Sequence, residues 1–186
     1  MRLSGRSRKL VGERVELRRH ESMDYELYGR WYGDPEIWRL TSWAGEPLTG
    51  SAVRRLFEDR ELSTTEDSFA IHPKEGRGPV GIVSLMNISE ANGTADLSII
   101  IGPPEARGRG YGTDAIRAIL RYGFEERGLG RVGLSVFDFN EAAIRAYTAL
   151  GFREEGRLRA ALEREGKRHD AILMSILASE WREGSG

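Results

Sequence analysis

PPEARGRGYGTDAIRAIL, residues 103–120, joins a glycine-rich loop directly to the start of an amphipathic helix. Three glycines stand at alternate positions: Gly108, Gly110 and Gly112. Glycine is a poor helix former, so its concentration where a helix begins needs a physical reason. A helix N-terminus exposes unpaired amide hydrogens and carries partial positive charge, and glycine lets an anion approach these amides closely. The stretch therefore favours a site for phosphate or pyrophosphate.

Other interpretations of the loop compete with this one. A bare G-x-G-x-G pattern is equally typical of a flexible, glycine-rich surface turn. A Walker loop is excluded because it requires Gly-Lys-Ser/Thr, and the stretch contains no lysine. A Rossmann fingerprint is excluded because Thr113 stands where the third glycine would fall when counted from Gly108.

Composition limits the class of protein. The chain has 186 residues, of which 39% are hydrophobic and 31% charged, as expected for one globular domain. Its net charge of -1 argues against a nucleic-acid partner. We expect a cytoplasmic protein without membrane contact, because no apolar stretch approaches the roughly 18–20 residues of a membrane span and the start lacks a signal-peptide core. The chain has no cysteine, and its three histidines lack metal-ligand spacing, so we expect no metal.

Hydrophobic periodicity predicts the order of the secondary-structure elements. Alternating apolar residues predict strands at 11–19, 67–73, 78–88, 92–102, 131–137, 151–158 and 168–177. Helical spacing predicts helices at 24–32, 52–62, 111–127 and 140–152. The Asp-Pro pair at 34–35 ends the first helix, because a residue before proline disfavours the helical conformation.

Two motifs together resemble one known family. The run Arg107-x-x-Gly110-x-Gly112, followed by NEAAIRAYTALGF at 140–152, is similar to the central motifs of the GCN5-related N-acetyltransferases (GNAT). The resemblance covers residues 10–177, and ADLSIIIG and GKRHDAILM look most like the branch with ribosomal-protein alanine and spermidine acetyltransferases. It implies an α/β (α+β) fold. In this fold a mostly antiparallel sheet of about seven strands, with splayed central strands, is flanked by about four helices.

The same resemblance implies a domain at 10–182, an N-terminal extension at 1–9 and a flexible tail at 183–186. It also implies acetyl-coenzyme A as co-substrate, without a metal. The backbone amides of the loop would hold the pyrophosphate: Arg107, Gly108, Arg109, Gly110, Tyr111, Gly112 and Thr113. The exposed backbone of the preceding strand would pair with the pantetheine arm: Ile99, Ile100 and Ile101. A strand buried on both faces explains these isoleucines equally well. Asn140 would bind pantetheine or simply cap a helix.

Amine acetylation requires proton transfers that a few side chains can supply. An alkyl ammonium with a pKa of about 10.4 must lose a proton before it attacks a thioester, and the departing thiolate gains from a nearby acid. The resemblance places Tyr147 as that acid, although a buried core tyrosine is the alternative. Asp96 is the expected base and Asp138 a lesser one, although both can equally be solvated carboxylates. Without cysteine or a Ser-His-acid grouping, direct transfer in a ternary complex is the simpler proposal.

The acceptor should be recognised by the variable region around WYGDPEIWRLTSWAGEP, residues 31–47. Trp38, with Trp31 and Trp43, offers an apolar wall, and Asp34 and Glu46 offer charge for an ammonium. These side chains can equally be core tryptophans and solvated acids. The expected partners are a small-molecule amine or a protein N-terminus, with a homodimer by analogy. The competing function is a non-catalytic coenzyme A sensor.

Overall fold

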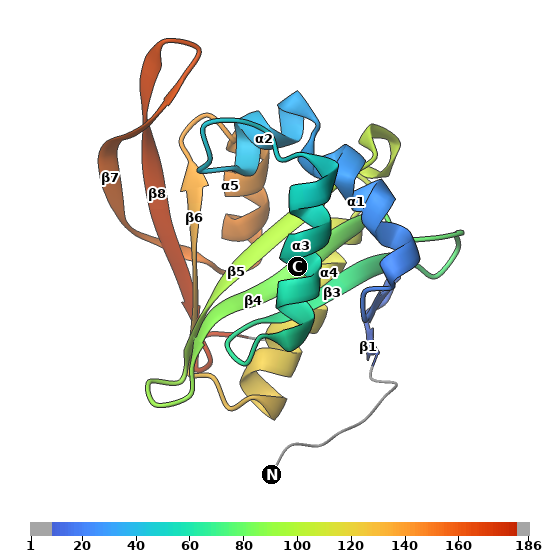
Figure 1. Ribbon diagram of the computed structural model, residues 1–186. Coiled ribbons are helices and arrows are strands. Elements are labelled where there is room, and N and C mark those ends of the chain that lie inside the picture. Colours follow the sequence, from blue (N-terminus) through green and yellow to red (C-terminus); the bar gives the residue numbers. More distant parts are fainter. Residues whose placement is uncertain (1–8, 182–186) are drawn as a thin grey trace.

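The computed structural model describes residues 9–181, in which one sheet is covered by helices on both faces (Figure 1). Residues 1–8 and 182–186 lie outside this range, and with them almost all of the expected N-terminal extension and the whole of the expected tail. Within residues 9–181, no helix is long and apolar enough to cross a membrane.

The sheet has eight strands in the order β1-β2-β3-β4-β5-β6-β8-β7. All neighbours pair antiparallel except β5 and β6, which are parallel. The strands are β1 Leu10–Val11, β2 Val15–Arg18, β3 Asp67–Pro73, β4 Gly81–Ser89, β5 Thr94–Ile101, β6 Arg131–Phe137, β7 Arg153–Arg164 and β8 Lys167–Leu177. All seven predicted strands are present, and β1 adds a short eighth.

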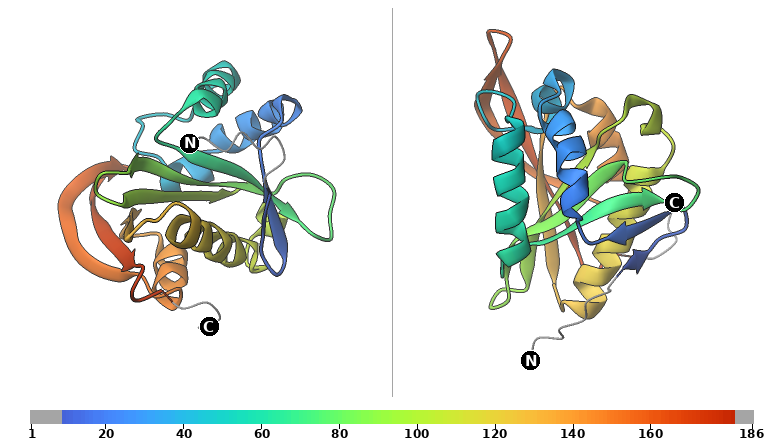
Figure 2. Two further views of the ribbon diagram at one scale, coloured as in Figure 1. Left: turned by 90° about the horizontal axis from the view of Figure 1, so that it is seen from below. Right: turned by 45° about the vertical axis from the view of Figure 1, so that its right-hand side comes forward.

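In the described part of the chain, five α-helices cover the sheet: α1 Tyr25–Tyr32, α2 Pro35–Thr41, α3 Gly50–Leu62, α4 Tyr111–Arg121 and α5 Glu141–Ala149. Helices α1 and α3 pack on one face, and α4 and α5 pack on the other (Figure 2). A π-helical turn, Tyr122–Glu126, extends α4 to nearly its predicted length. The apolar periodicity of each helix thus becomes a buried stripe against one face of the sheet.

Helix α2 was not predicted. The Asp34-Pro35 pair ends α1 as expected, but it also starts a new helix. Pro35 occupies the first helical position, where its missing amide hydrogen costs nothing, and Oδ1 of Asp34 accepts hydrogen bonds from the amides of Glu36 (2.7 Å) and Ile37 (3.2 Å). The same dipeptide therefore works as both a stop and a cap.

The central strands splay, as the family resemblance implies. Strands β5 and β6 pair only through Thr94 with Arg131, Ala95 with Val132, and Asp96 with Gly133. Beyond Asp96 the two strands diverge, so residues 97–101 of β5 have a strand neighbour on the β4 side alone (Figure 1). The divergence opens the middle of the sheet and leaves backbone groups of β5 facing the opening.

Candidate active site

The glycine loop forms the N-terminus of α4. Gly110 is its N-cap residue with φ 81° and ψ 0°, and Gly108 has φ 69°, both left-handed conformations that favour glycine. The first hydrogen bond of the helix runs from the amide of Asp114 to the carbonyl of Gly110 (3.0 Å). The amides of the preceding turn therefore have no intrahelical acceptor. They border a hollow of about 600 Å³ whose lining includes Gly108, Arg109, Gly110, Tyr111 and Thr113.

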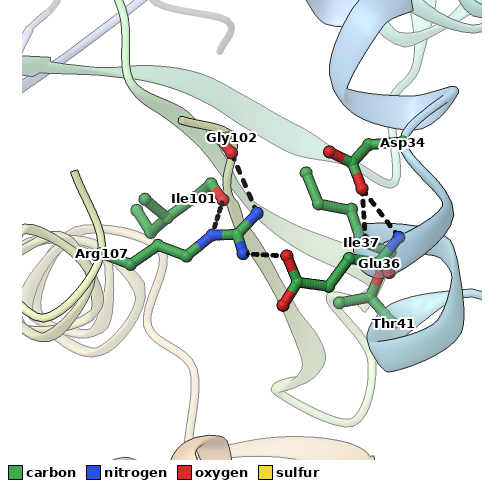
Figure 3. A network of polar contacts seen from close by, with 7 residues as sticks. All are labelled: Asp34, Glu36, Ile37, Thr41, Ile101, Gly102 and Arg107. Atoms are coloured by element: carbon green, nitrogen blue, oxygen red, sulfur yellow. Dashed lines mark hydrogen bonds and ion pairs between the residues drawn. The ribbon is translucent and has the colours of Figure 1, made fainter. Parts of the chain in front are cut away.

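Arg107 lies differently from its predicted role. Its guanidinium points back to the end of β5, where Nε and Nη2 donate to the carbonyls of Ile101 (3.3 Å) and Gly102 (3.1 Å) (Figure 3). Nη1 forms an ion pair with Glu36 on α2 (2.7 Å). The amide of Arg107 donates to the carbonyl of Pro104 (3.1 Å). Arg107 thus ties β5 to α2, and the amides that remain for an anion begin one residue later.

Asp114 anchors the loop, a role the sequence did not reveal. Its carboxylate is buried and accepts hydrogen bonds from the amides of Glu13 (3.0 Å), Arg14 (2.7 Å) and Val15 (2.9 Å). These bonds fix the first turn of α4 against the start of β2. An acidic residue in a first helical turn is the only sequence signal for this, and it is indistinguishable from an ordinary helix-dipole contact.

A cleft of about 520 Å³ occupies the opening between β5 and β6. It brings together several predicted residues from β5 and from α5 with its N-cap: Asp96, Ile99, Asn140 and Tyr147. The side of the cleft formed by α2 and the segment after it contributes residues that include Trp43. The side chain of Ile100 packs in the core beneath α1 and α3, whereas Ile99 and Ile101 pack in the other core. Both expectations for these isoleucines are thus compatible, since their side chains pack in the cores while one backbone edge lacks a strand neighbour.

Tyr147 extends from α5 into the cleft wall, with its ring centroid 5.7 Å from that of Phe152. Burial raises the pKa of Tyr147 to about 12, because the phenolate loses solvation. Within residues 9–181, no hydrogen bond engages its hydroxyl. The group is therefore a protonated phenol at neutral pH, and its hydroxyl is available as a hydrogen-bond donor.

Asp96 stands where the two strands separate. Its Oδ2 accepts a hydrogen bond from Nδ2 of Asn87 (2.9 Å), which lies on a bulge of β4 with φ 50°. A side chain at Gly133 would place Cβ 3.3 Å from Oδ1 of Asp96, closer than most real contacts. The exposed Asp96 carboxylate is thus oriented by one neighbour and given space by another. Neither Asn87 nor Gly133 carries a motif that would have revealed this.

An ion pair lies near Asp96 in the lining of the cleft. Arg131 on β6 donates to both carboxylate oxygens of Glu155 on β7 (2.6 and 2.5 Å), and Ser175 donates to the same group (2.7 Å). These hydrogen bonds, first that of Arg131, lower the pKa of Glu155 to about 2. Glu155 therefore remains ionised at neutral pH, but Arg131 largely neutralises it.

Asn140 serves as a helix cap and as a tie between elements. Its Oδ1 accepts from the amide of Ala143 (3.3 Å), and its Nδ2 donates to the carbonyl of Leu40 on α2 (3.3 Å). The capping alternative is confirmed. Asp138, the lesser candidate for the base, contacts Nδ1 of His169 (3.1 Å) and accepts from the amide of Asp170 (3.1 Å), outside the residues that line the cleft.

The predicted acceptor residues are dispersed. Trp31 is a core residue packed against Gly102, and Trp38 is half-buried with Nε1 donating to the carbonyl of Ala44 (2.9 Å). Asp34 caps α2, as described above, and Glu46 is exposed in the following loop. None of these lines the cleft. The tryptophan that does so is Trp43, which is 52% exposed and packs edge-on against Phe137 at 5.1 Å.

The described residues offer no group of three His, Asp or Glu side chains placed to hold a metal ion. They form a mostly antiparallel sheet that opens between the parallel strands β5 and β6. The glycine-rich N-terminus of α4 follows β5 in the chain. This combination defines an acyltransferase of the GNAT class. Residues 14–153 match the acetyltransferase (GNAT) domain, and the chain belongs to that family.

Two relatives give the resemblance more detail. The spermidine N(1)-acetyltransferase of Escherichia coli (strain K12) is 36% identical over 167 residues, 90% of this chain and 88% of that protein. The crystal structure of spermidine N-acetyltransferase from Vibrio cholerae in complex with CoA and spermine has a TM-score of 0.82 at 27% identity, covering 90% of this chain and 97% of that one. A dodecameric structure of the Vibrio cholerae enzyme has a TM-score of 0.76 at 26% identity, covering 93% of this chain and 99% of that one.

Proposed function

We propose that this N-acetyltransferase moves the acetyl group of acetyl-CoA to a primary amine by direct attack within a ternary complex. The observation that carries the proposal is the cleft between β5 and β6, where Tyr147 and Asp96 line one cavity beside the open edge of β5. No cysteine is present to form an acyl-enzyme intermediate. Asp96 and Tyr147 in one cleft suit direct transfer, in which the protein supplies orientation.

In this proposal the backbone holds acetyl-CoA. The amides of residues 108–113 would bind the pyrophosphate, supported by the left-handed glycines and the missing intrahelical acceptors. The edge of residues 99–101 that lacks a strand neighbour would pair with the pantetheine arm in the manner of a sheet, although the carbonyl of Ile101 at its end already accepts from Arg107. Asn140 already has two partners, so we assign it a role in shaping the cleft rather than in binding.

Two side chains would move the protons. Asp96 would accept the proton of the acceptor ammonium, directly or through water, because its carboxylate faces the cleft and is oriented by Asn87. Tyr147 would donate its proton to the departing thiolate and would regain one, through water, from the amine nitrogen, which loses its second proton as the amide forms. The reference pKa of the thiol, about 8.5, lies below that of the buried phenol, so the donation has to be concerted with this reprotonation. The amine nitrogen forms its bond to the acetyl carbon as the carbon–sulfur bond breaks.

We propose a polyamine as the first acceptor to test. Similarity to the spermidine acetyltransferases supports this choice, as do the carboxylate of Asp96 and the exposed ring of Trp43 in the cleft. Asp34 and Glu46 are left out of the proposed acceptor site. Self-association, first predicted as a homodimer, remains part of the proposal because a similar enzyme forms a dodecamer.

The competing function is a coenzyme A sensor without catalysis. It would keep the glycine loop but would not need an ordered acid and base in one cleft. The chain retains both Tyr147 and Asp96 there, which favours the enzyme.

Thermal denaturation with acetyl-CoA and then turnover with a panel of amines test the proposal. Acetyl-CoA at about 100 times its dissociation constant should stabilise the fold by about 2.7 kcal/mol. Release of free CoA thiol should then be fastest with a polyamine, compared with amino acids, aminoglycosides and N-terminal peptides. Absence of any shift overturns all acetyl-CoA functions, and a shift without turnover on any amine favours the sensor.

A further inference from the structure

Arg164, the last residue of β7, is a buried cation that lacks a carboxylate partner in the described part of the chain. Its side chain is buried, with the whole residue only 7% exposed, and no carboxylate within residues 9–181 pairs with it. Nη1 donates to the carbonyl of Glu163 (2.9 Å), and Nη2 donates to the carbonyl of Ser42 in the segment after α2. Nε is buried without a hydrogen-bond partner. A buried guanidinium is costly unless it is compensated, so its retention here calls for a role.

Aromatic rings supply the missing compensation. The guanidinium carbon lies 4.2 Å from the ring centroid of Trp38 on α2 and 5.9 Å from that of Phe137 on β6. Cation–π attraction is strongest in desolvated positions such as this one. Arg164 therefore joins three elements that are far apart in the sequence. The β7–β8 hairpin and the segment between α2 and α3 lie at the same end of the molecule, as Figure 1 and the right view of Figure 2 show.

The contacts of Arg164 fall on the segment that walls the cleft. Ser42 lies between Thr41 and Trp43, and both of these residues line the cleft. Nε1 of Trp38 donates to the carbonyl of Ala44 (2.9 Å), so the ring under Arg164 also closes the turn that carries Trp43. Trp43 in turn packs against Phe137, which Arg164 also contacts. Arg164 therefore contacts residues on either side of Trp43 in the cleft wall.

We infer that Arg164 is a positioning residue for the amine acceptor, because it fixes the segment of residues 40–44 and thereby sets the place of Trp43 in the cleft. The inference rests on the proposed function, in which the amine enters beside Trp43. The acetyl-CoA loop lies at α4 and has no contact with Arg164. Binding of the two substrates should therefore respond differently to a change at this residue.

Arg164→Lys is the decisive variant, because lysine keeps the charge but loses the planar fork that stacks on a ring and reaches two carbonyls. The Michaelis constant for the best amine should rise about tenfold or more, whereas that for acetyl-CoA should stay within about twofold. The matched control is Arg168→Lys on the same hairpin, where the side chain is 67% exposed and 3.6 Å from Glu163. It should leave both constants unchanged.

Two further measurements keep the inference testable if a variant folds poorly. Amide hydrogen exchange at residues 40–46 should be faster in Arg164→Lys than in the wild type, without a change around residues 108–116, and this readout needs no turnover. Trp43→Ala should raise the amine constant, and the double variant should be no worse than the stronger single one, because both changes act through one wall.

Equal rises in both Michaelis constants, or additive effects in the double variant, would overturn the inference and leave Arg164 a merely structural residue. Unchanged exchange at residues 40–46 would do the same. These failures are distinct from failure of the proposed function. In that case the wild-type protein itself would acetylate no amine.

Discussion

The glycine loop before α4 and the cleft between β5 and β6 are built by opposite means. In the loop, one continuous stretch of backbone exposes amides without intrahelical acceptors, and its geometry depends on two left-handed glycines. In the wall of the cleft, Arg164 binds the carbonyl of Ser42, which precedes Trp43 and lies 122 residues earlier in the chain. A site made of local backbone can be predicted from a short run of sequence. A site assembled from distant side chains can be recognised only in the folded structure.

Gly110→Glu tests the glycine loop before α4 and should have the largest effect of the changes considered. The new carboxylate would stand where we place the pyrophosphate, so affinity for acetyl-CoA should fall by about a thousandfold, or about 4 kcal/mol. Loss of the acetyl-CoA shift in a thermal denaturation assay would measure this. Gly128→Glu is the matched control, because Gly128 has a similar φ of 68° with open space around it and lines neither the hollow at α4 nor the cleft. If Gly110→Glu keeps the shift, the loop is only a surface turn.

Tyr147→Phe tests the proposed acid catalysis in the cleft and should have the next largest effect. Removing the hydroxyl should lower kcat by about a hundredfold or more and leave the acetyl-CoA shift intact, because general acid catalysis contributes roughly 10²–10⁴. Since burial raises the pKa of Tyr147 to about 12, kcat should show no loss from phenol ionisation between pH 6 and about 10. Tyr25→Phe, which removes a hydroxyl bonded to Glu61, is the control. Undiminished kcat in Tyr147→Phe would exclude the phenol as the acid.

Most of the fold could be predicted because its signals are local. Alternation gave the seven long strands, and helical spacing gave four helices. Helix α2 escaped because Asp-Pro is both a helix stop and a helix start, and the following seven residues are too short to show a clear period. The splay of β5 and β6 came from family resemblance, since no local pattern states where two strands stop pairing.

The candidate site could be predicted only in part, and the tryptophans show why. The three tryptophans of residues 31–43 could not be told apart from the sequence. In the structure, Trp31 lies in the core, Trp38 stacks under Arg164 and Trp43 lines the cleft. The contacts that distinguish them, such as that of Trp38 with Arg164 of β7, have no counterpart in the local sequence. Asp114 escaped for the same reason, because its three amide partners lie about 100 residues earlier in the chain.

Asp34 offers the sharpest separation of local structure from recognition, and the smallest effect. As a helix cap, Asp34→Ala should cost about 1 kcal/mol, seen as a fall in Tm of about 2–4 °C, because the amides of Glu36 and Ile37 lose their acceptor. Asp34→Asn keeps an accepting oxygen but removes the charge, so both Tm and the Michaelis constant for the amine should stay near the wild-type values. If Asp34 instead attracts the acceptor ammonium, Asp34→Asn would raise that constant while leaving Tm unchanged. The pair of variants thus decides whether this carboxylate belongs to the helix or to the substrate.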